Sequence, residues 1–221
     1  MSTCRVLIYS VFERFWHWTQ MALIFTMLIT GFAIHGLFDW ISFDQAVTLH
    51  TLAALGLLAL WIIATFWLFT TGNWKHYLPT TTGLMQVIRF YTHGIFHGER
   101  HPYRKAFWRK HNPLQAIAYL ALKLVLFPLI WTTGILYLLY FAWGDAPGAA
   151  VWLEWIALVH TATAYAILAF VIIHVYMLTI GSFLHHVAPM ITGFDDVDLS
   201  PEEQAYLLQD EPGRIRCTNI V

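Results

Sequence analysis

The most informative part of the chain is residues 155–183, WIALVHTATAYAILAFVIIHVYMLTIGSF, which contain no Asp, Glu, Lys or Arg. A helix needs about 20 apolar residues to cross the core of a bilayer, and this run is longer. Three other stretches lack charged side chains in the same way: 15–38, 45–74 and 124–144. None of the four alternates between polar and apolar residues as a barrel strand does, so only helices would satisfy the backbone within the membrane. The sequence predicts an all-α integral membrane protein with a bundle of four transmembrane helices.

The expected spans are about 15–36, 46–69, 113–143 and 152–183. They form a transmembrane domain, residues 1–194, which is followed by a cytoplasmic tail, residues 195–221. Between spans two and three, apolar residues recur at helical spacing: Leu84, Val87, Ile88, Tyr91 and Ile95. This spacing predicts an amphipathic helix over 82–97 that lies on the cytoplasmic membrane surface.

The composition indicates the same class of protein. Of the 221 residues, 58% are hydrophobic and 11% are charged, whereas soluble domains carry about 25% charged residues. The formal net charge of −1 provides no basic surface for nucleic acid. These values exclude an ordinary water-soluble enzyme, a disordered chain and a nucleic-acid-binding protein, and they make the lipid bilayer a partner. Cys4 and Cys217 lie at opposite ends of the chain and are predicted to be free thiols.

The basic residues indicate the orientation. Eleven of the twelve Lys and Arg residues lie before span one, between spans two and three, or in the tail, and Lys123 is the exception. The connections 37–45 and 144–151 contain acidic residues and no Lys or Arg. By the positive-inside rule, both termini and the loop 70–112 are cytoplasmic, and the two short connections face outward.

Four of the twelve histidines fall inside the expected spans: His17, His50, His160 and His174. Because successive spans run in opposite directions, His17 and His174 lie at the cytoplasmic level, and His50 and His160 lie at the outer level. His160 and His174 are 14 residues apart, which is nearly four turns and about 21 Å along one helix face. Ionisable side chains inside a membrane are costly and usually functional.

Two stacked b-type haems explain this pattern, because two neutral imidazoles are a common pair of axial ligands. The inner iron would be held by His17 and His174, and the outer iron by His50 and His160. Polar contacts between helices and a single shared metal are the alternatives. The 14-residue separation excludes one metal ion for both His160 and His174.

Three glycines fit the same prediction. Gly31 lies 14 residues after His17 and therefore on the same face, at the outer level. A glycine there would let a porphyrin approach the backbone, and Gly56 and Gly134 are candidates for the same role. Small residues also simply help helices to pack, and this alternative remains open for each of them.

Four segments resemble the bacterial di-haem cytochrome b subunits of nickel–iron hydrogenases, respiratory formate dehydrogenases and thiosulfate-reductase-like enzymes. They are Arg14-Phe-Trp-His17-Trp, His50 early in span two, His111-Asn-Pro-Leu-Gln115, and His160 with His174 in span four. The resemblance covers roughly residues 10–185. It implies the same assignment of the histidines to two haems, electron exchange with quinone near the inner haem, and a place for Asn112 near that quinone.

Five further polar residues are candidates for binding. His111, Asn112 and Gln115 combine a titratable group with amide donors, which suits a quinone carbonyl whose protonation changes on reduction. Asn112 also suits a helix cap. Lys123, inside span three, is interpreted as a partner of a haem propionate or of quinone, with a snorkelling lysine as the alternative. Arg14 either neutralises a haem propionate or only sets the topology.

The leading hypothesis is an electron-transfer subunit of a respiratory oxidoreductase complex in a bacterial inner membrane. It would carry two haems and link the quinone pool to a periplasmic iron–sulfur or multihaem cytochrome subunit, with substrate chemistry on a separate catalytic subunit. The subunit itself is either non-catalytic or reactive towards quinone.

The alternative is a histidine-rich transmembrane metal transporter that uses the same histidines and a cluster at His93, His97 and His101. The expected spans contain one Asp or Glu residue, Glu154 in the first turn of the fourth, so no acidic path runs through the membrane, which disfavours this alternative. A membrane anchor without a cofactor is a third hypothesis, and it leaves four depth-matched histidines unexplained.

Overall fold

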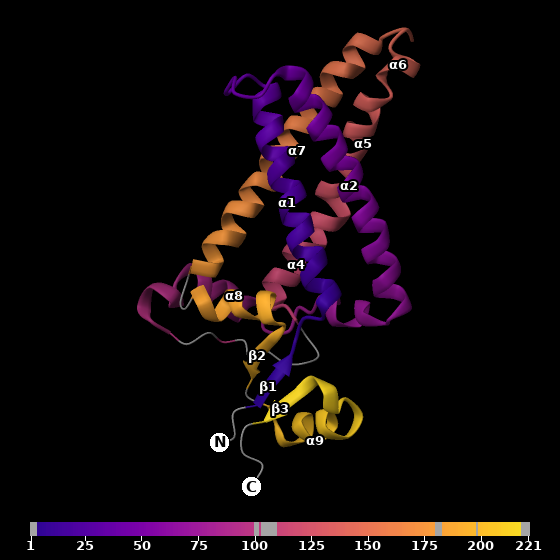
Figure 1. Ribbon diagram of the computed structural model, residues 1–221. Helices are drawn as coiled ribbons and strands as arrows, with labels where there is room; N and C mark the ends of the chain where they lie inside the picture. The colour runs from indigo at the N-terminus through magenta and orange to yellow at the C-terminus, as the bar shows by residue number, and fades with distance from the viewer. Residues whose placement is uncertain (1–3, 100–101, 103–109, 180–182, 198, 218–221) are drawn as a thin grey trace. The chain divides into compact units, whose positions relative to one another are not determined.

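The computed structural model describes residues 4–99, 102, 110–179, 183–197 and 199–217 of the 221. The chain divides into two compact units. Unit 1 comprises residues 1–78, 103–112 and 182–221, and unit 2 comprises residues 79–102 and 113–181. Figure 1 labels the principal helices and strands of both.

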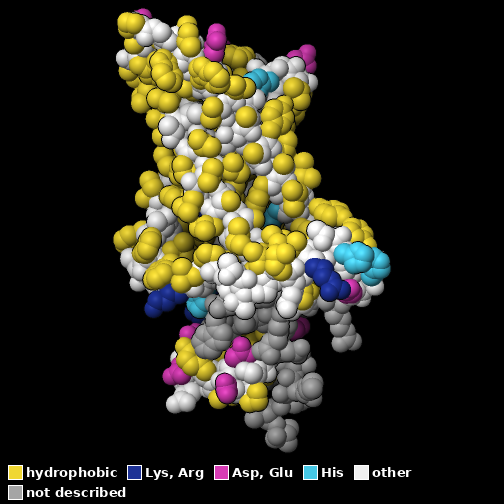
Figure 2. All heavy atoms as spheres, turned by 180° about the vertical axis from the view of Figure 1, so that it is seen from behind, with side chains coloured by type: hydrophobic (Ala, Val, Ile, Leu, Met, Phe, Trp, Pro, Cys, Tyr) yellow, Lys and Arg dark blue, Asp and Glu magenta, His cyan; other side chains and the backbone are white. Residues whose placement is uncertain are grey.

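Within the described residues, four helical segments are long and apolar enough to cross a membrane: Val11–Ile34, Phe43–Thr70, Pro113–Leu138 and Ala149–Thr179. Each overlaps one expected span, so the prediction of a helical membrane protein is confirmed. Large apolar side chains point outward from these helices; Phe66 is 69% exposed and Ile173 is 60% exposed. Figure 2 shows hydrophobic side chains covering most of the helical surface that is in view, as expected of a surface in contact with lipid.

In unit 1, helices α1 (Val11–Ile34) and α2 (Phe43–Thr70) pack against each other. Helix α1 begins with a capping box, in which Glu13 N donates to Ser10 Oγ and Ser10 N donates to Glu13 Oε2. Ser42 caps α2 by accepting a hydrogen bond from Gln45 N. Helix α1 therefore begins four residues, and α2 three residues, before the span expected from the sequence. The difference arises because the first turn of each helix contains polar residues that a search for uncharged runs leaves out. A 3₁₀ turn, Asn73–Tyr77, follows α2.

In unit 2, the third span consists of α4 (Pro113–Ala121), a π-helical turn (Leu122–Leu126) and α5 (Phe127–Leu138). Pro128 has no N–H, and in a regular helix its ring would collide with the carbonyl of the residue four positions earlier, which accounts for the widened turn. The short helix α6 (Tyr140–Trp143) follows, and α5 packs on the long helix α7 (Ala149–Thr179).

The amphipathic helix expected over 82–97 is present as α3 (Leu84–Thr92), followed by a 3₁₀ turn over Gly94–His97. Val87 and Phe90 are buried, whereas Met85 on another face is 73% exposed. Gly94 is conformationally less favourable in a helix, which is consistent with the end of the α-helix before it.

The two ends of the chain form a three-stranded antiparallel sheet of order β2-β1-β3 that the sequence did not reveal. Its strands are β1 (Cys4–Leu7), β2 (Phe194–Val197) and β3 (Ile215–Cys217). Helix α8 (Phe183–Thr192) precedes β2, and α9 (Pro201–Asp210) follows it. Val6 and Leu207, both 0% exposed, lie in its core. The tail is therefore packed on the N-terminal strand.

Cys4 is disulfide-bonded, so the prediction of a free thiol at this position is wrong. The sheet register places Cys4 opposite Cys217. Strand pairing brings the chain ends together, and their separation in the sequence had concealed this proximity.

Candidate cofactor site: four histidines in the spanning helices

In unit 1, His50 of α2 packs against a Thr-Gly pair of α1. His50 Nδ1 lies 3.0 Å from Thr30 Oγ1. A Cβ atom on Gly31 would lie 3.7 Å from His50 Cε1, so the imidazole ring rests directly on the backbone of α1. The space beside Gly31, which the sequence suggested for a porphyrin, therefore adjoins the histidine ring itself.

In unit 2, His160 of α7 repeats this arrangement against α5. His160 Nδ1 lies 2.9 Å from Thr133 Oγ1. A Cβ atom on Gly134 would lie 3.4 Å from His160 Cε1. The ring of Tyr137 meets the imidazole edge-on, with centroids 5.8 Å apart. The two histidines expected at the outer level are thus held by equivalent contacts in separate units.

Thr30 and Thr133 are functional candidates that sequence reasoning missed. Their shared signal is a Thr-Gly dipeptide inside an apolar helix. The same dipeptide also occurs at residues 71–72, 82–83 and 192–193, where it lies outside the expected spans or at their ends. The dipeptide becomes informative only when the register of the neighbouring helix is known.

His174 of α7 lies between two aromatic side chains of unit 2. Tyr119 Oη of α4 is 3.2 Å from His174 Nδ1. The ring of Phe170, one turn earlier on α7, is nearly parallel to the imidazole, with centroids 6.0 Å apart. At His174 a phenol hydroxyl therefore takes the position that a threonine hydroxyl takes at His160.

His17 lies near the start of α1, where its ring meets that of Trp18 edge-on at a centroid distance of 5.2 Å. Of the four candidate ligands, His17 and His50 belong to unit 1, and His160 and His174 belong to unit 2. All four are partly buried.

The three candidates for a quinone contact divide between the units. His111 and Asn112 belong to unit 1, whereas Gln115 lies in the first turn of α4 in unit 2. Asn112 is 5% exposed. The ring centroids of His111 and Tyr77 lie 5.4 Å apart. A shared role for the three residues stays a prediction.

The two basic candidates lie in different settings. Arg14 Nη1 donates to the carbonyl of Ile191 near the end of α8, so Arg14 links the start of α1 to the segment before β2. Lys123 lies, partly buried, in the π-helical turn of the third span. Such turns are frequent at functional sites. The roles of both residues toward a cofactor stay predictions.

An ionic cluster at the start of α1 was not expected from the sequence. Glu13 Oε1 accepts hydrogen bonds from Lys110 Nζ and Tyr77 Oη, and the side chains of Glu13 and Lys110 are both 3% exposed. Burial lowers the pKa of Lys110, and the negative charge of Glu13 opposes that shift. Burial, reinforced by the same charge, raises the pKa of Tyr77 well above its ordinary value of 10.0.

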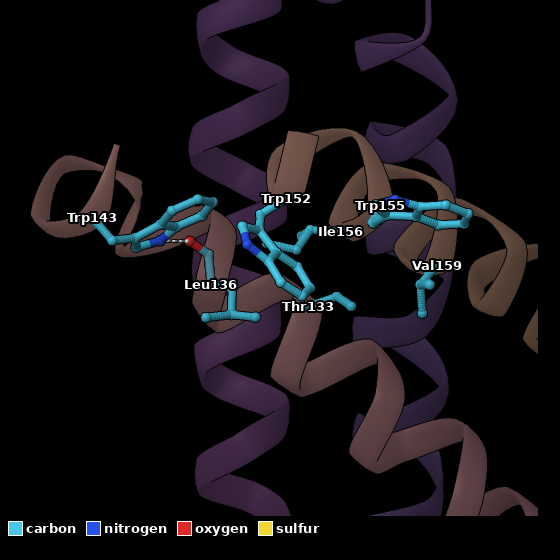
Figure 3. A pocket seen from close by; sticks show the side chains of 7 residues that line it. All are labelled: Thr133, Leu136, Trp143, Trp152, Trp155, Ile156 and Val159. Atoms are coloured by element: carbon cyan, nitrogen blue, oxygen red, sulfur yellow. Dashed lines mark hydrogen bonds between the residues drawn. The ribbon is translucent and has the colours of Figure 1, made fainter. Parts of the chain in front are cut away.

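A hollow of about 360 Å³ adjoins Thr133 in unit 2. Three tryptophans line it together with smaller residues: Trp143, Trp152, Trp155, Leu136, Ile156 and Val159. Figure 3 shows the Trp143 indole N–H donating to the carbonyl of Leu136 at 2.9 Å. Because the lining is apolar apart from Thr133, the hollow suits a hydrocarbon chain and offers no group for acid–base chemistry.

Among the described residues, no group of three or more His, Cys, Asp or Glu side chains is arranged to hold a metal ion. The rings of His93 and His97 do lie close together, with centroids 4.1 Å apart. His101, the third member of the predicted cluster, lies outside the described residues. The metal-transporter hypothesis therefore gains no support from the described part of the chain.

Comparison with known proteins adds an independent finding. The family described as "Prokaryotic cytochrome b561" matches residues 8–193. The Escherichia coli (strain K12) protein named "Putative cytochrome YdhU" is 32% identical over 197 residues, which cover 86% of this chain and 74% of that protein. No solved structure matches the chain. The family match includes all four spans and all four candidate histidines.

Proposed function

The chain belongs to the prokaryotic cytochrome b561 family, and is thus a membrane electron-transfer cytochrome with b-type haem; from this premise we propose that it carries two haems and links a periplasmic redox partner to the quinone pool. Bound haem supplies one-electron chemistry. The residues of this chain hold and orient that group.

The observation that carries the proposal is the contact made by Nδ1 in two of the four intramembrane histidines. In His50 and His160 this nitrogen lies 3.0 and 2.9 Å from the hydroxyl oxygens of Thr30 and Thr133. Histidines that bind iron typically engage their other ring nitrogen with a second group, which fixes the tautomer and the ring orientation. With Nδ1 engaged, Nε2 is the nitrogen suited to bind iron. The donor set therefore fits a b-type haem.

We assign His17 and His174 to an inner haem, and His50 and His160 to an outer haem. The support for this pairing is the depth of each histidine along spans that alternate in direction. Attachment would rest on axial ligation alone, because the sequence contains no Cys-x-x-Cys-His motif. Lys123 and Arg14 are the proposed partners of haem propionates.

Quinone is proposed to react on the cytoplasmic side, beside the inner haem, with His111, Asn112 and Gln115 as contacts. The support is the chemistry of these side chains, since amides can donate to a quinone carbonyl and an imidazole can exchange protons with it. A periplasmic iron–sulfur or multihaem cytochrome subunit, together with a catalytic subunit, would complete the assembly.

The test of the proposal is a count of haem in the purified full-length protein. A pyridine haemochrome assay, combined with a dithionite-reduced minus oxidised spectrum, should give two b-type haems per chain. Addition of a reduced quinone analogue should reduce part of that haem. One haem per chain, or a folded protein without haem, would refute the two-haem assignment.

The proposed localisation is the bacterial inner membrane with both termini in the cytoplasm, and it has its own test. Its support is the position of eleven of the twelve basic residues on that side. Green fluorescent protein fused after Val221 should fluoresce, and alkaline phosphatase fused there should be inactive. An active phosphatase at this position would reverse the orientation and exchange the inner and outer levels.

A further inference from the structure

The hydroxyl groups of Thr30 and Thr133 each lie within hydrogen-bond distance of two carbonyls of their own helix, of which the nearer is the main acceptor. Thr30 Oγ1 donates to the carbonyl of Thr26 at 2.7 Å, and Thr133 Oγ1 donates to the carbonyl of Leu129 at 2.7 Å. Both acceptors lie four residues earlier on the same helix, which is a usual partner for threonine in a helix. A hydroxyl has one proton and two lone pairs. Each threonine oxygen therefore meets its histidine as an acceptor.

When each hydroxyl proton lies on a backbone carbonyl, the histidine nitrogen at the contact is the donor. In that arrangement Nδ1 carries the proton in His50 and in His160, and Nε2 carries a lone pair. Thr30 and Thr133 are 2% and 6% exposed, so water does not compete for these hydroxyl groups. The two contacts select one neutral tautomer at both histidines, and it is the tautomer that can bind iron through Nε2.

The neighbouring glycines restrict the same rings from a second direction. The distances from a Cβ atom on Gly31 or Gly134 to the Cε1 atoms of His50 and His160 would be 3.7 and 3.4 Å. Each ring is therefore confined between a hydroxyl group and a stretch of helix backbone. This confinement limits rotation about the Cβ–Cγ bond and sets the direction of Nε2.

We propose that Thr30 and Thr133 are positioning residues that hold His50 and His160 in the Nδ1-protonated tautomer and so set the redox potential of the outer haem. The inference rests on the proposed function, because it takes both histidines as ligands of that haem. A hydrogen bond donated by Nδ1 makes an imidazole a better electron donor to iron, and a hydroxyl does this less strongly than a carboxylate. Removal of the acceptor should weaken the donor and favour the ferrous state.

The experiment compares valine and serine at both positions in the full-length haem protein. Valine matches the shape of threonine without its hydroxyl, and serine keeps the hydroxyl. In a potentiometric titration, Thr30→Val and Thr133→Val should each shift the same one of the two haem potentials upward. The double variant should shift it further, and the second potential should stay in place. Thr30→Ser and Thr133→Ser should remain close to the unmodified protein.

Thr26→Val is the matched control on α1. Its hydroxyl makes the same kind of bond, to Ala22 O at 2.9 Å, and it lies one turn before Thr30. Loss of the outer haem from the valine variants, with retention in the serine variants and in Thr26→Val, would also support the inference. Unchanged potentials in fully haem-loaded valine variants, or an equal shift in Thr26→Val, would overturn the role of the two threonines and leave the two-haem proposal standing. An unmodified protein without haem would overturn the proposed function as well.

Discussion

Glu13 and Lys110 form an ion pair whose side chains are both 3% exposed, although 97 positions separate them in the chain. Lys110 Nζ also lies 5.5 Å from the ring centroids of Tyr9 and Tyr77. The pair therefore joins the segment before the third span to the first turn of α1. In so buried a position each charge depends on the other for compensation.

Lys110→Met should destabilise unit 1 by about 3–5 kcal/mol, because removal of one partner leaves a buried carboxylate without its counter-charge. The double variant Glu13→Gln with Lys110→Met should recover part of this loss, since it removes both charges. The measurement is unfolding by denaturant in detergent micelles. Lys75→Met is the control, because Lys75 is exposed. Equal stability of Lys110→Met and Lys75→Met would show that the pair contributes little.

Tyr77 should make the protein sensitive to alkaline pH. Burial and the nearby Glu13 charge raise its pKa well above 10.0, whereas tyrosine in an unfolded chain ionises near pH 10, at about its ordinary pKa. Above that pH the unfolded state releases a proton that the folded state retains, so stability is full below about pH 10 and falls as the pH rises. Unfolding measured from pH 9 to pH 11 should show a steeper loss for the natural protein than for Tyr77→Phe. Parallel curves would contradict this assignment.

Hydropathy was enough to predict the four spans, because the bilayer selects long uncharged runs whatever packs around them. The π-helical turn at Leu122–Leu126 was not predicted, because Pro128 in an apolar run indicates disruption without specifying its form. The terminal sheet was missed for another reason. Its strands are short, and the pairing of Arg5 with Asp196 joins residues 191 positions apart.

The candidate site was also predictable only in part, because the sequence shows which residues are unusual in a span but not which residues meet across helices. Histidines stand out in an apolar span because an ionisable group there is costly. Thr30 and Thr133 do not stand out, because a threonine that bonds its own helix backbone is well tolerated there. Their contacts with His50 and His160 depend on helix register. Glu13 was not singled out in the sequence, because its partner Lys110 is 97 positions away and only the fold brings the two together.

Replacing the proposed ligands tests the pairing. His50→Ala and His160→Ala should each remove the same haem, so that haem content falls to about half and the remaining haem keeps its potential. His17→Ala and His174→Ala should remove the other one. Haem content is measured by pyridine haemochrome, and the surviving potential by redox titration. Loss of different haems from His50→Ala and His160→Ala would refute the pairing by depth.

Asn112→Ala should weaken the binding of a quinone-analogue inhibitor about tenfold, which corresponds to the loss of one hydrogen bond worth about 1–1.5 kcal/mol. Inhibition of quinol-driven haem reduction gives the measurement. Asn73→Ala is a suitable control, because the Asn73 side chain bonds Thr71 in the same unit. Equal inhibition of Asn112→Ala and the natural protein would move the quinone contact elsewhere.

Substitution of the glycines beside the imidazoles should show how tightly the rings are held. Alanine places its Cβ at 3.7 Å from His50 Cε1 or 3.4 Å from His160 Cε1, which is ordinary contact, so Gly31→Ala and Gly134→Ala should keep both haems. The branched Gly31→Val and Gly134→Val should push the rings aside, and the outer haem content should fall by half or more because the core cannot absorb the added volume. Gly213→Val is the control, since nothing lies within 4 Å of a Cβ atom placed there. If all three valine variants retain or lose haem alike, the glycines serve general helix packing and confine neither ring.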